Sequence, residues 1–131
     1  MTIGLVAKAR GTFEVNANPD GVPQIFDGIG HSRWTFDKTF TGGLQGTSVV
    51  AMTAAGIEGT ETAVYVAVER VNGTLDGRSG AFVMTHHAER TKDSNRLIIT
   101  VAPGVSTGEL SGLRGTMEIG PDHSYELEYE L

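Results

Sequence analysis

The sequence predicts an all-β protein, and three observations carry that prediction. Apolar and polar residues alternate with a period of two along most of the chain, and no window of about ten good helix formers carries apolar residues at helical spacing. The gaps between alternating segments are too short for crossover helices, so neighbouring strands should run antiparallel. Glycine is frequent, at 18 of 131 residues, but lacks the three-residue period of collagen. It therefore marks turns in a globular chain.

Eight segments carry the alternation. The first covers residues 5–15, beginning at Leu5, and places Phe13 and Val15 on the face opposite Lys8 and Glu14, as in a half-buried strand. The others cover residues 31–41, 44–55, 61–71, 78–89, 96–102, 114–119 and 125–131. The last is the clearest, because its tyrosines and leucines alternate with glutamates and burial fixes its register.

The segment between the first two strands breaks the pattern. Residues 16–30 contain the turn signals Pro19-Asp20-Gly21 and Asp27-Gly28. They also contain Ile25, Phe26 and Ile29, which a fully solvated loop does not need. We expect this segment to form a packed lid.

Two of the predicted strands are apolar on both faces. Residues 49–52 read Val-Val-Ala-Met, and residues 64–68 read Val-Tyr-Val-Ala-Val. A strand buried on both sides needs a second layer outside its sheet. We therefore expect a homodimer or higher homo-oligomer whose interface covers the outer faces of these strands.

The motif Gly-x-Leu-x-Gly occurs three times, at residues 42–46, 73–77 and 108–112. Each copy lies where one strand gives way to the next, where glycine permits a tight corner and leucine fills the core. A phosphate-binding loop is the weaker interpretation, because no helix follows and no Gly-Lys-Ser/Thr occurs. The glycines are therefore architectural.

About eight antiparallel strands in one domain of residues 1–131 form either a closed barrel or a sandwich. Residues 69–83 (ERVNGTLDGRSGAFV), followed by His86, resemble the central signature of the bacterial domain-of-unknown-function 3224 family. Residues 103–115 (PGVSTGELSGLRG) are similar to its second signature. The opening and closing strands also match, so the resemblance covers nearly the whole chain.

The resemblance implies a single small antiparallel barrel of about eight strands, like that of allene oxide cyclase, and usually oligomeric. One departure is Val105, where family members commonly have Ser or Gly. The resemblance brings no established activity, so function is argued from the residues themselves.

Charge and composition narrow the setting. The formal net charge of −6 offers no electrostatic footprint for nucleic acid or an anionic membrane surface, so we expect neither as a partner. The absence of cysteine removes thiolate chemistry and suits a reducing cytoplasm, where we expect the protein to reside. No cofactor motif is present, and we expect no cofactor.

Lys38 is the sharpest local anomaly. It shares a face with Trp34, Phe36 and Phe40, so its ammonium lies on the most aromatic stripe of the protein. One interpretation is that Lys38 extends to solvent at the barrel mouth. The other is that it lines a cavity, where it is a candidate for acid–base catalysis or for forming a Schiff base, and Trp34 is a candidate ligand contact.

The neighbouring residues Glu69 and Arg70 occupy opposite faces of one strand, so one of them points into apolar surroundings. If Glu69 points inward, it can pair with Lys38 or act as a general base beside Tyr65. If Arg70 points inward, it can bind a substrate carboxylate. A purely structural role in fixing the barrel corners is the alternative.

His86 shares a face with Phe82 and Met84, whereas His87 points the other way, so the two cannot ligate one metal from a regular strand. We expect no metal site. His86 is either a general base or a hydrogen-bonded core histidine. Tyr125 and Tyr129 point inward by strand parity, and their hydroxyls either orient a ligand or bond to the backbone.

Three functions follow from this set of residues. The first is binding of a small, mostly apolar molecule inside the barrel, with the inward polar residues as contacts. The second is an isomerase or cyclase that confines a reactive epoxide or polyene and assists it by acid–base chemistry. The third is a structural oligomer whose barrel is filled and holds no ligand.

Overall fold

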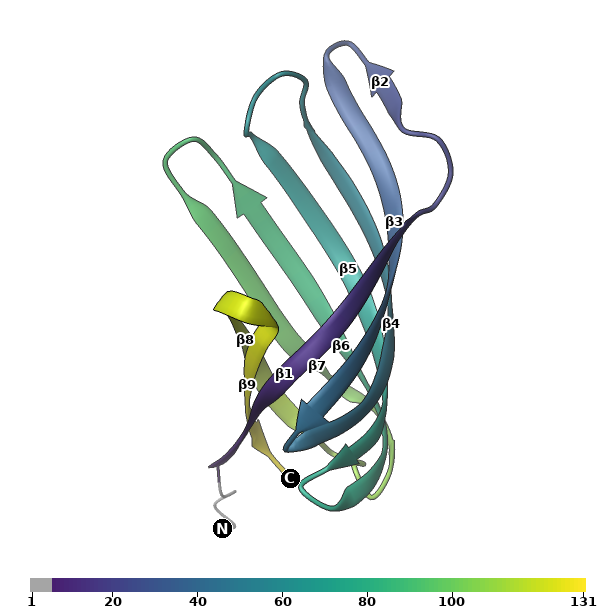
Figure 1. The fold of residues 1–131 in the computed structure, drawn as a ribbon, viewed down its shortest axis with the longest axis vertical. Helices are drawn as coiled ribbons and strands as arrows, with labels where there is room; N and C mark the ends of the chain where they lie inside the picture. The colour runs from purple at the N-terminus through teal and green to yellow at the C-terminus, as the bar shows by residue number, and fades with distance from the viewer. Residues whose placement is uncertain (1–5) are drawn as a thin grey trace.

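The computed structural model describes residues 6–131, in which one antiparallel sheet closes into a barrel (Figure 1). Its elements are β1 (Val6–Pro19), β2 (Gln24–Phe26), β3 (Ile29–Gly42), β4 (Leu44–Ile57), β5 (Ala63–Leu75), β6 (Arg78–Arg90), β7 (Asn95–Gly108), β8 (Arg114–Gly120), the 3-10 helix η1 (Pro121–His123) and β9 (Ser124–Glu130). Leu5, at which the sequence predicts the first strand to begin, lies outside the described residues. Within the described range, no helix is long and apolar enough to cross a membrane.

The ring closes through β1, which pairs with β9 along one edge and with β3 along the other. From β3 to β9 each strand pairs with the next, so β1 and β3–β9 form the ring of eight strands. β2 pairs only with β3 and lies outside the ring. The predicted antiparallel barrel is confirmed, and the sandwich alternative is wrong because a single sheet closes on itself.

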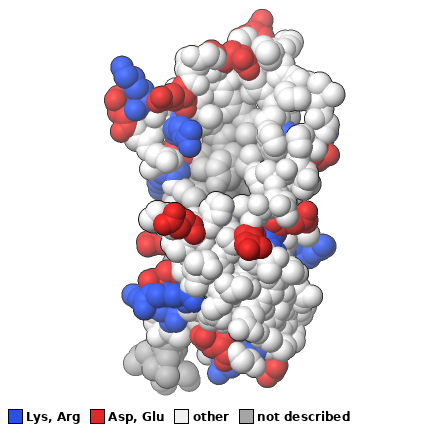
Figure 2. Space-filling model, in the orientation of Figure 1, with Lys and Arg blue, Asp and Glu red and all other residues white. Residues whose placement is uncertain are grey.

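The barrel is filled at one end and open at the other. β3 to β7 are 13 or 14 residues long, whereas β8 and β9 have seven each. The long strands therefore continue past η1 as a curved sheet, seen in the upper half of Figure 1. Figure 2 shows that the face in view is hollowed in this upper half, with uncharged residues predominating inside the hollow.

The closed end holds the hydrophobic core. Phe40, Phe82, Met84, Ile99 and Leu127 are each at most 2% exposed and pack there. The leucines of the three glycine motifs also close this end: Leu44, Leu75 and Leu110 are at most 1% exposed. The prediction that the motifs are strand corners with a leucine in the core is confirmed.

The packed lid predicted for residues 16–30 is wrong. β1 continues to Pro19 in register with β3, and the short β2 then folds back onto the start of β3. Because β2 is hydrogen-bonded on one edge and lies outside the ring, its side chains meet no second layer. Ile25 and Phe26 are accordingly 66% and 79% exposed.

The apolar outer faces predicted from the sequence are present on the barrel wall. Val49, Val64, Val66 and Val68 all point outward from β4 and β5 and are at least 40% exposed. Their inward neighbours Val50 and Ala67 are buried. The expectation that a second copy of the chain covers this face stays a prediction.

Tyr125 ties β9 to the corner between β3 and β4. Its hydroxyl accepts a hydrogen bond from the backbone N–H of Leu44 at 3.0 Å and donates to the carbonyl of Thr41 at 2.8 Å. We expect Tyr125→Phe to lower the free energy of unfolding by about 1–3 kcal/mol, because buried backbone groups lose their partner. Urea denaturation measures the change. Tyr65→Phe is the control, because the Tyr65 hydroxyl makes no hydrogen bond within residues 6–131; an equal loss in both variants would contradict the prediction.

Candidate functional site

Four polar side chains are buried inside the barrel among residues 6–131: Lys38, Ser48, Glu69 and His86. They come from four consecutive strands, β3 to β6, and share their inward face with the core residues. The strand register brings these four residues to the same height along the barrel. Lys38 on β3 lies opposite Ser48 on β4, and Glu69 on β5 is a diagonal neighbour of His86 on β6. We call these four residues the polar cluster.

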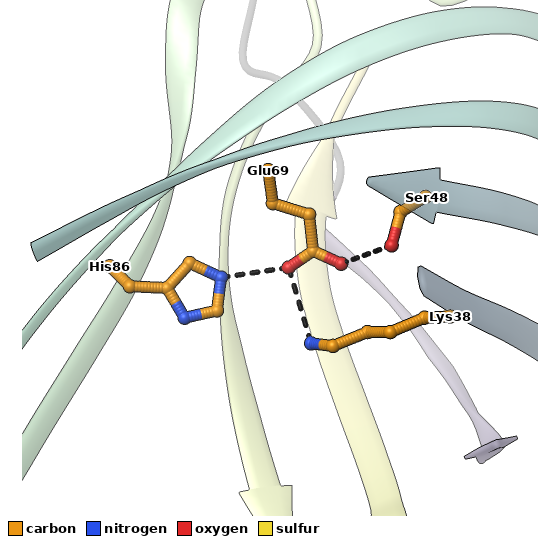
Figure 3. A network of polar contacts seen from close by, with 4 residues as sticks. All are labelled: Lys38, Ser48, Glu69 and His86. Carbon is orange, nitrogen blue, oxygen red and sulfur yellow. Dashed lines mark hydrogen bonds and ion pairs between the residues drawn. The ribbon is translucent and has the colours of Figure 1, made fainter. Parts of the chain in front are cut away.

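Glu69 is the centre of the polar cluster (Figure 3). Its Oε1 lies 2.7 Å from Nε2 of His86 and 3.3 Å from Nζ of Lys38. Its Oε2 accepts a hydrogen bond from Oγ of Ser48 at 2.6 Å. The Glu69 side chain has no exposed surface, so each of its oxygens depends on these partners.

The partners decide the charge of Glu69. Burial by itself raises the pKa of the carboxyl, but the His86 hydrogen bond, the Lys38 charge and the Ser48 hydroxyl together hold the pKa below its usual value. Glu69 is therefore an anion at neutral pH. The charge of Glu69, together with burial, also raises the pKa of Tyr65, which remains a neutral phenol.

An ionised Glu69 fixes the proton on His86. A carboxylate oxygen can only accept, so Nε2 of His86 carries the hydrogen in their contact. Nδ1 makes no hydrogen bond within residues 6–131, and no polar side-chain atom in that range is both buried and unpartnered. Nδ1 is therefore accessible, and Figure 3 shows it turned away from the carboxylate.

Lys38 is held over aromatic rings. Its ammonium nitrogen lies 4.7 Å from the ring centroid of Phe13 and 5.9 Å from that of Phe40. The ring faces attract the cation, and Glu69 supplies the opposite charge. One of the three ammonium hydrogens is engaged by Glu69, which leaves donors for a further oxygen atom.

An apolar cleft of about 310 Å³ lies directly against the polar cluster. It is lined by Val15, Phe36, Val50, Met52, Tyr65 and Ile119 together with Lys38 and His86. Trp34 stacks on Phe36 with ring centroids 6.5 Å apart. The cleft thus has apolar and aromatic walls. At its floor lie the ammonium of Lys38 and the imidazole of His86, and each of them contacts the carboxylate of Glu69.

The structure brings Lys38, Glu69, His86 and Tyr65 together. Trp34 reaches the cleft only through its stack on Phe36, and the other predicted site residues are separated from the cluster. Arg70 lies on the exposed outer face, so Glu69 is the inward member of the pair. The hydroxyl of Tyr125 is engaged at the β3–β4 corner. That of Tyr129 is hydrogen-bonded to Asp76, and burial together with this acidic partner raises the pKa of Tyr129 to about 12.

Ser48 is the member of the polar cluster that the sequence analysis missed. Its signal is a hydroxyl in the inward register of an otherwise apolar strand, between Leu44 and Val50. The acidic and imidazole side chains of residues 6–131 form no group of three that could hold a metal ion.

The fold and the site define a class of protein: a small closed antiparallel barrel with a buried polar cluster beneath an apolar cleft. The chain belongs to the DUF3224 family, proteins of unknown function, whose model matches residues 9–131. A crystal structure of a DUF3224 protein of unknown function from Shewanella oneidensis is similar, with 36% sequence identity, 96% coverage of each chain and a TM-score of 0.85. No match to the chain was found among curated proteins.

Proposed function

We propose that the protein binds a small, mostly apolar molecule in the cleft between the polar cluster and the open end of the barrel. The observation that carries the proposal is a cleft of about 310 Å³ whose apolar walls converge on a few polar groups. Small-molecule sites have this character and begin at about this size.

The position of the cleft supports the same proposal. The closed end of the barrel is packed with leucine, phenylalanine and methionine and leaves no room for a ligand. The cleft lies above this packed core, bounded by Val15 on β1 and Ile119 on β8, where the ring strands end and the curved sheet begins. A ligand can enter from the open side and reach Lys38 and His86 without opening the core.

The test uses the bicyclic hydrocarbon tetralin and its ketone, 2-tetralone. Trp34 is the only tryptophan of the chain and stacks on the cleft residue Phe36, so its fluorescence reports occupation of the cleft. We expect saturable changes in emission with both compounds. Val15→Phe places a ring in the cleft and should weaken binding about tenfold, which corresponds to about 1.4 kcal/mol.

Val66→Phe is the matched control, because it makes the same substitution on the outer wall, where Val66 is 51% exposed. We expect it to bind both compounds like the unmodified protein. Unchanged emission with both compounds up to their solubility limits would contradict the proposal. If both variants weaken binding equally, the compounds bind outside the cleft.

A second candidate function is an isomerase or cyclase that confines a reactive apolar substrate such as an epoxide or a polyene. One observation favours it over binding alone: the cleft is lined by His86, whose imidazole is held by a buried carboxylate. Binding an inert apolar molecule does not require that arrangement. General acid–base catalysis does.

A further inference from the structure

We propose that His86 is a general base for removing a proton from a carbon next to a carbonyl group, and that Lys38 stabilises the enolate that forms. The inference rests on the proposed function, because the carbonyl compound must occupy the cleft. It assigns a chemical class to the ligand: a small apolar ketone or related carbonyl compound. It also assigns a reaction, which is proton exchange or movement of a double bond along the carbon chain.

The base is built by the contact between His86 and Glu69. Glu69 accepts the Nε2 hydrogen at 2.7 Å, so the neutral ring presents an unprotonated Nδ1. When Nδ1 takes a proton, the imidazolium charge forms beside a carboxylate that is already ionised. A buried carboxylate that orients an imidazole and stabilises its cation is a recurring device of base catalysis.

The ammonium supplies the second requirement of the reaction. Removing a proton next to a carbonyl places negative charge on the carbonyl oxygen, and a fixed cation stabilises that charge most strongly where water is scarce. Lys38 lines the same cleft as His86, is 8% exposed and retains hydrogens that Glu69 does not engage. Base and cation thus contact the same carboxylate oxygen, Oε1 of Glu69.

The step balances without any further reactant. Nδ1 of His86 takes the proton, the C–H electron pair becomes a carbon–carbon double bond, and the carbonyl π pair moves to oxygen as the enolate. The imidazolium, after exchanging its proton with water, returns a proton either to the same carbon, which completes hydrogen exchange, or to the far end of a conjugated enolate, which moves the double bond. No electrons leave the substrate and no group is transferred.

The neighbouring hydroxyls do not offer an alternative chemistry. The Ser48 hydroxyl donates its hydrogen to Oε2 of Glu69 at 2.6 Å, and the lowered pKa of that carboxyl makes it a weak base. Burial and the Glu69 charge keep Tyr65 protonated. An attacking serine or tyrosine oxygen is therefore absent from the polar cluster, whereas an imidazole base is present.

Proton exchange into 2-tetralone measures the reaction directly. We expect the protein in D₂O buffer to accelerate the loss of the proton NMR signals next to the carbonyl, with saturation by 2-tetralone and competition by tetralin. In His86→Gln the new side chain retains an N–H donor for Glu69 but lacks a basic nitrogen. We expect this variant to lose about 100-fold or more of the acceleration and still to bind tetralin.

His87→Gln is the matched control, because the same substitution is made one residue along β6 on the exposed outer face. It should exchange protons at the unmodified rate. Lys38→Met should also lose the acceleration while Trp34 fluorescence still reports tetralin. Nitrogen-15 NMR of the neutral form of His86 should show the hydrogen on Nε2 and none on Nδ1.

The outcomes separate the two proposals. If the emission of Trp34 responds to tetralin but 2-tetralone exchanges only at the buffer rate, binding stands and His86 is not such a base. If His86→Gln exchanges at the unmodified rate, or if the Nδ1–H tautomer is found, the assignment of the base is overturned. If no compound changes the emission, the proposed function fails, and buffer-rate exchange overturns the base as well.

Discussion

Glu69→Gln is expected to lower the free energy of unfolding by about 3–5 kcal/mol, the usual cost of removing one partner from a buried ion pair. The substitution preserves the shape of the side chain but leaves the buried ammonium of Lys38 without its counter-charge. It also weakens the acceptor for Ser48 and His86. Urea denaturation at neutral pH measures the loss.

The control for this prediction is a double-mutant cycle with Lys38→Met. Each single variant strands the opposite charge, whereas Lys38→Met combined with Glu69→Gln removes both charges. The double variant should therefore be more stable than the sum of the two single losses allows. Strict additivity would mean that the 3.3 Å contact between Nζ and Oε1 contributes no coupling to the folded state.

The same carboxylate gives the stability a defined pH dependence. Because the pKa of Glu69 is lower in the folded chain than its ordinary value of 4.5, its contribution is fully present above that value. It is lost as the pH falls below 4.5 and through the lowered pKa of the folded state. Between these two pKa values the unmodified protein should lose stability more steeply than Glu69→Gln, which has no carboxyl at this position.

Gly73→Ala is the second substitution with a large expected effect. Gly73 on β5 lies directly opposite Gly46 on β4. A methyl group added at Gly73 would lie 2.1 Å from the carbonyl oxygen of Gln45, a backbone atom that cannot rotate away. The two strands must separate at a barrel corner, so we expect a loss of about 3 kcal/mol or more in unfolding free energy.

Gly30→Ala is the control for Gly73→Ala. The methyl group added at Gly30 would meet only the end of the Glu58 side chain, which can move aside. We expect its unfolding free energy to stay within about 0.5 kcal/mol of the unmodified protein. If both variants unfold at the same urea concentration, the close approach of β4 and β5 at this corner is not what requires glycine.

The glycine motifs show where local sequence information is sufficient. Their position between strands and the leucine at their centre predict corners with a core side chain, and Leu44, Leu75 and Leu110 are buried accordingly. The motifs do not reveal that Gly46 and Gly73 face each other across neighbouring strands. That pairing joins two copies of the motif, so it exists only once the strands have found their register.

The polar cluster shows the same division. Strand parity places Phe82, Met84 and His86 on one face, and that face is buried. On β5 parity separates Glu69 from Arg70 but does not choose between them, because both faces of the strand are apolar. Closure of the ring places Glu69 inside the barrel, because the face of β5 that carries Val66 and Val68 is on the outside.

The sequence by itself therefore determined the eight strands of the ring, their antiparallel order, the corners and the set of residues that share each face. The tertiary structure alone decided which face of β5 is inside, that Ser48 completes the polar cluster, and that residues 16–30 leave the cleft uncovered. The physical reason is the sequence separation of the interacting residues. The alternation of apolar and polar residues depends on adjacent positions, whereas Lys38 and Glu69 lie 31 residues apart. Their contact arises only when β3, β4 and β5 pair and the barrel closes.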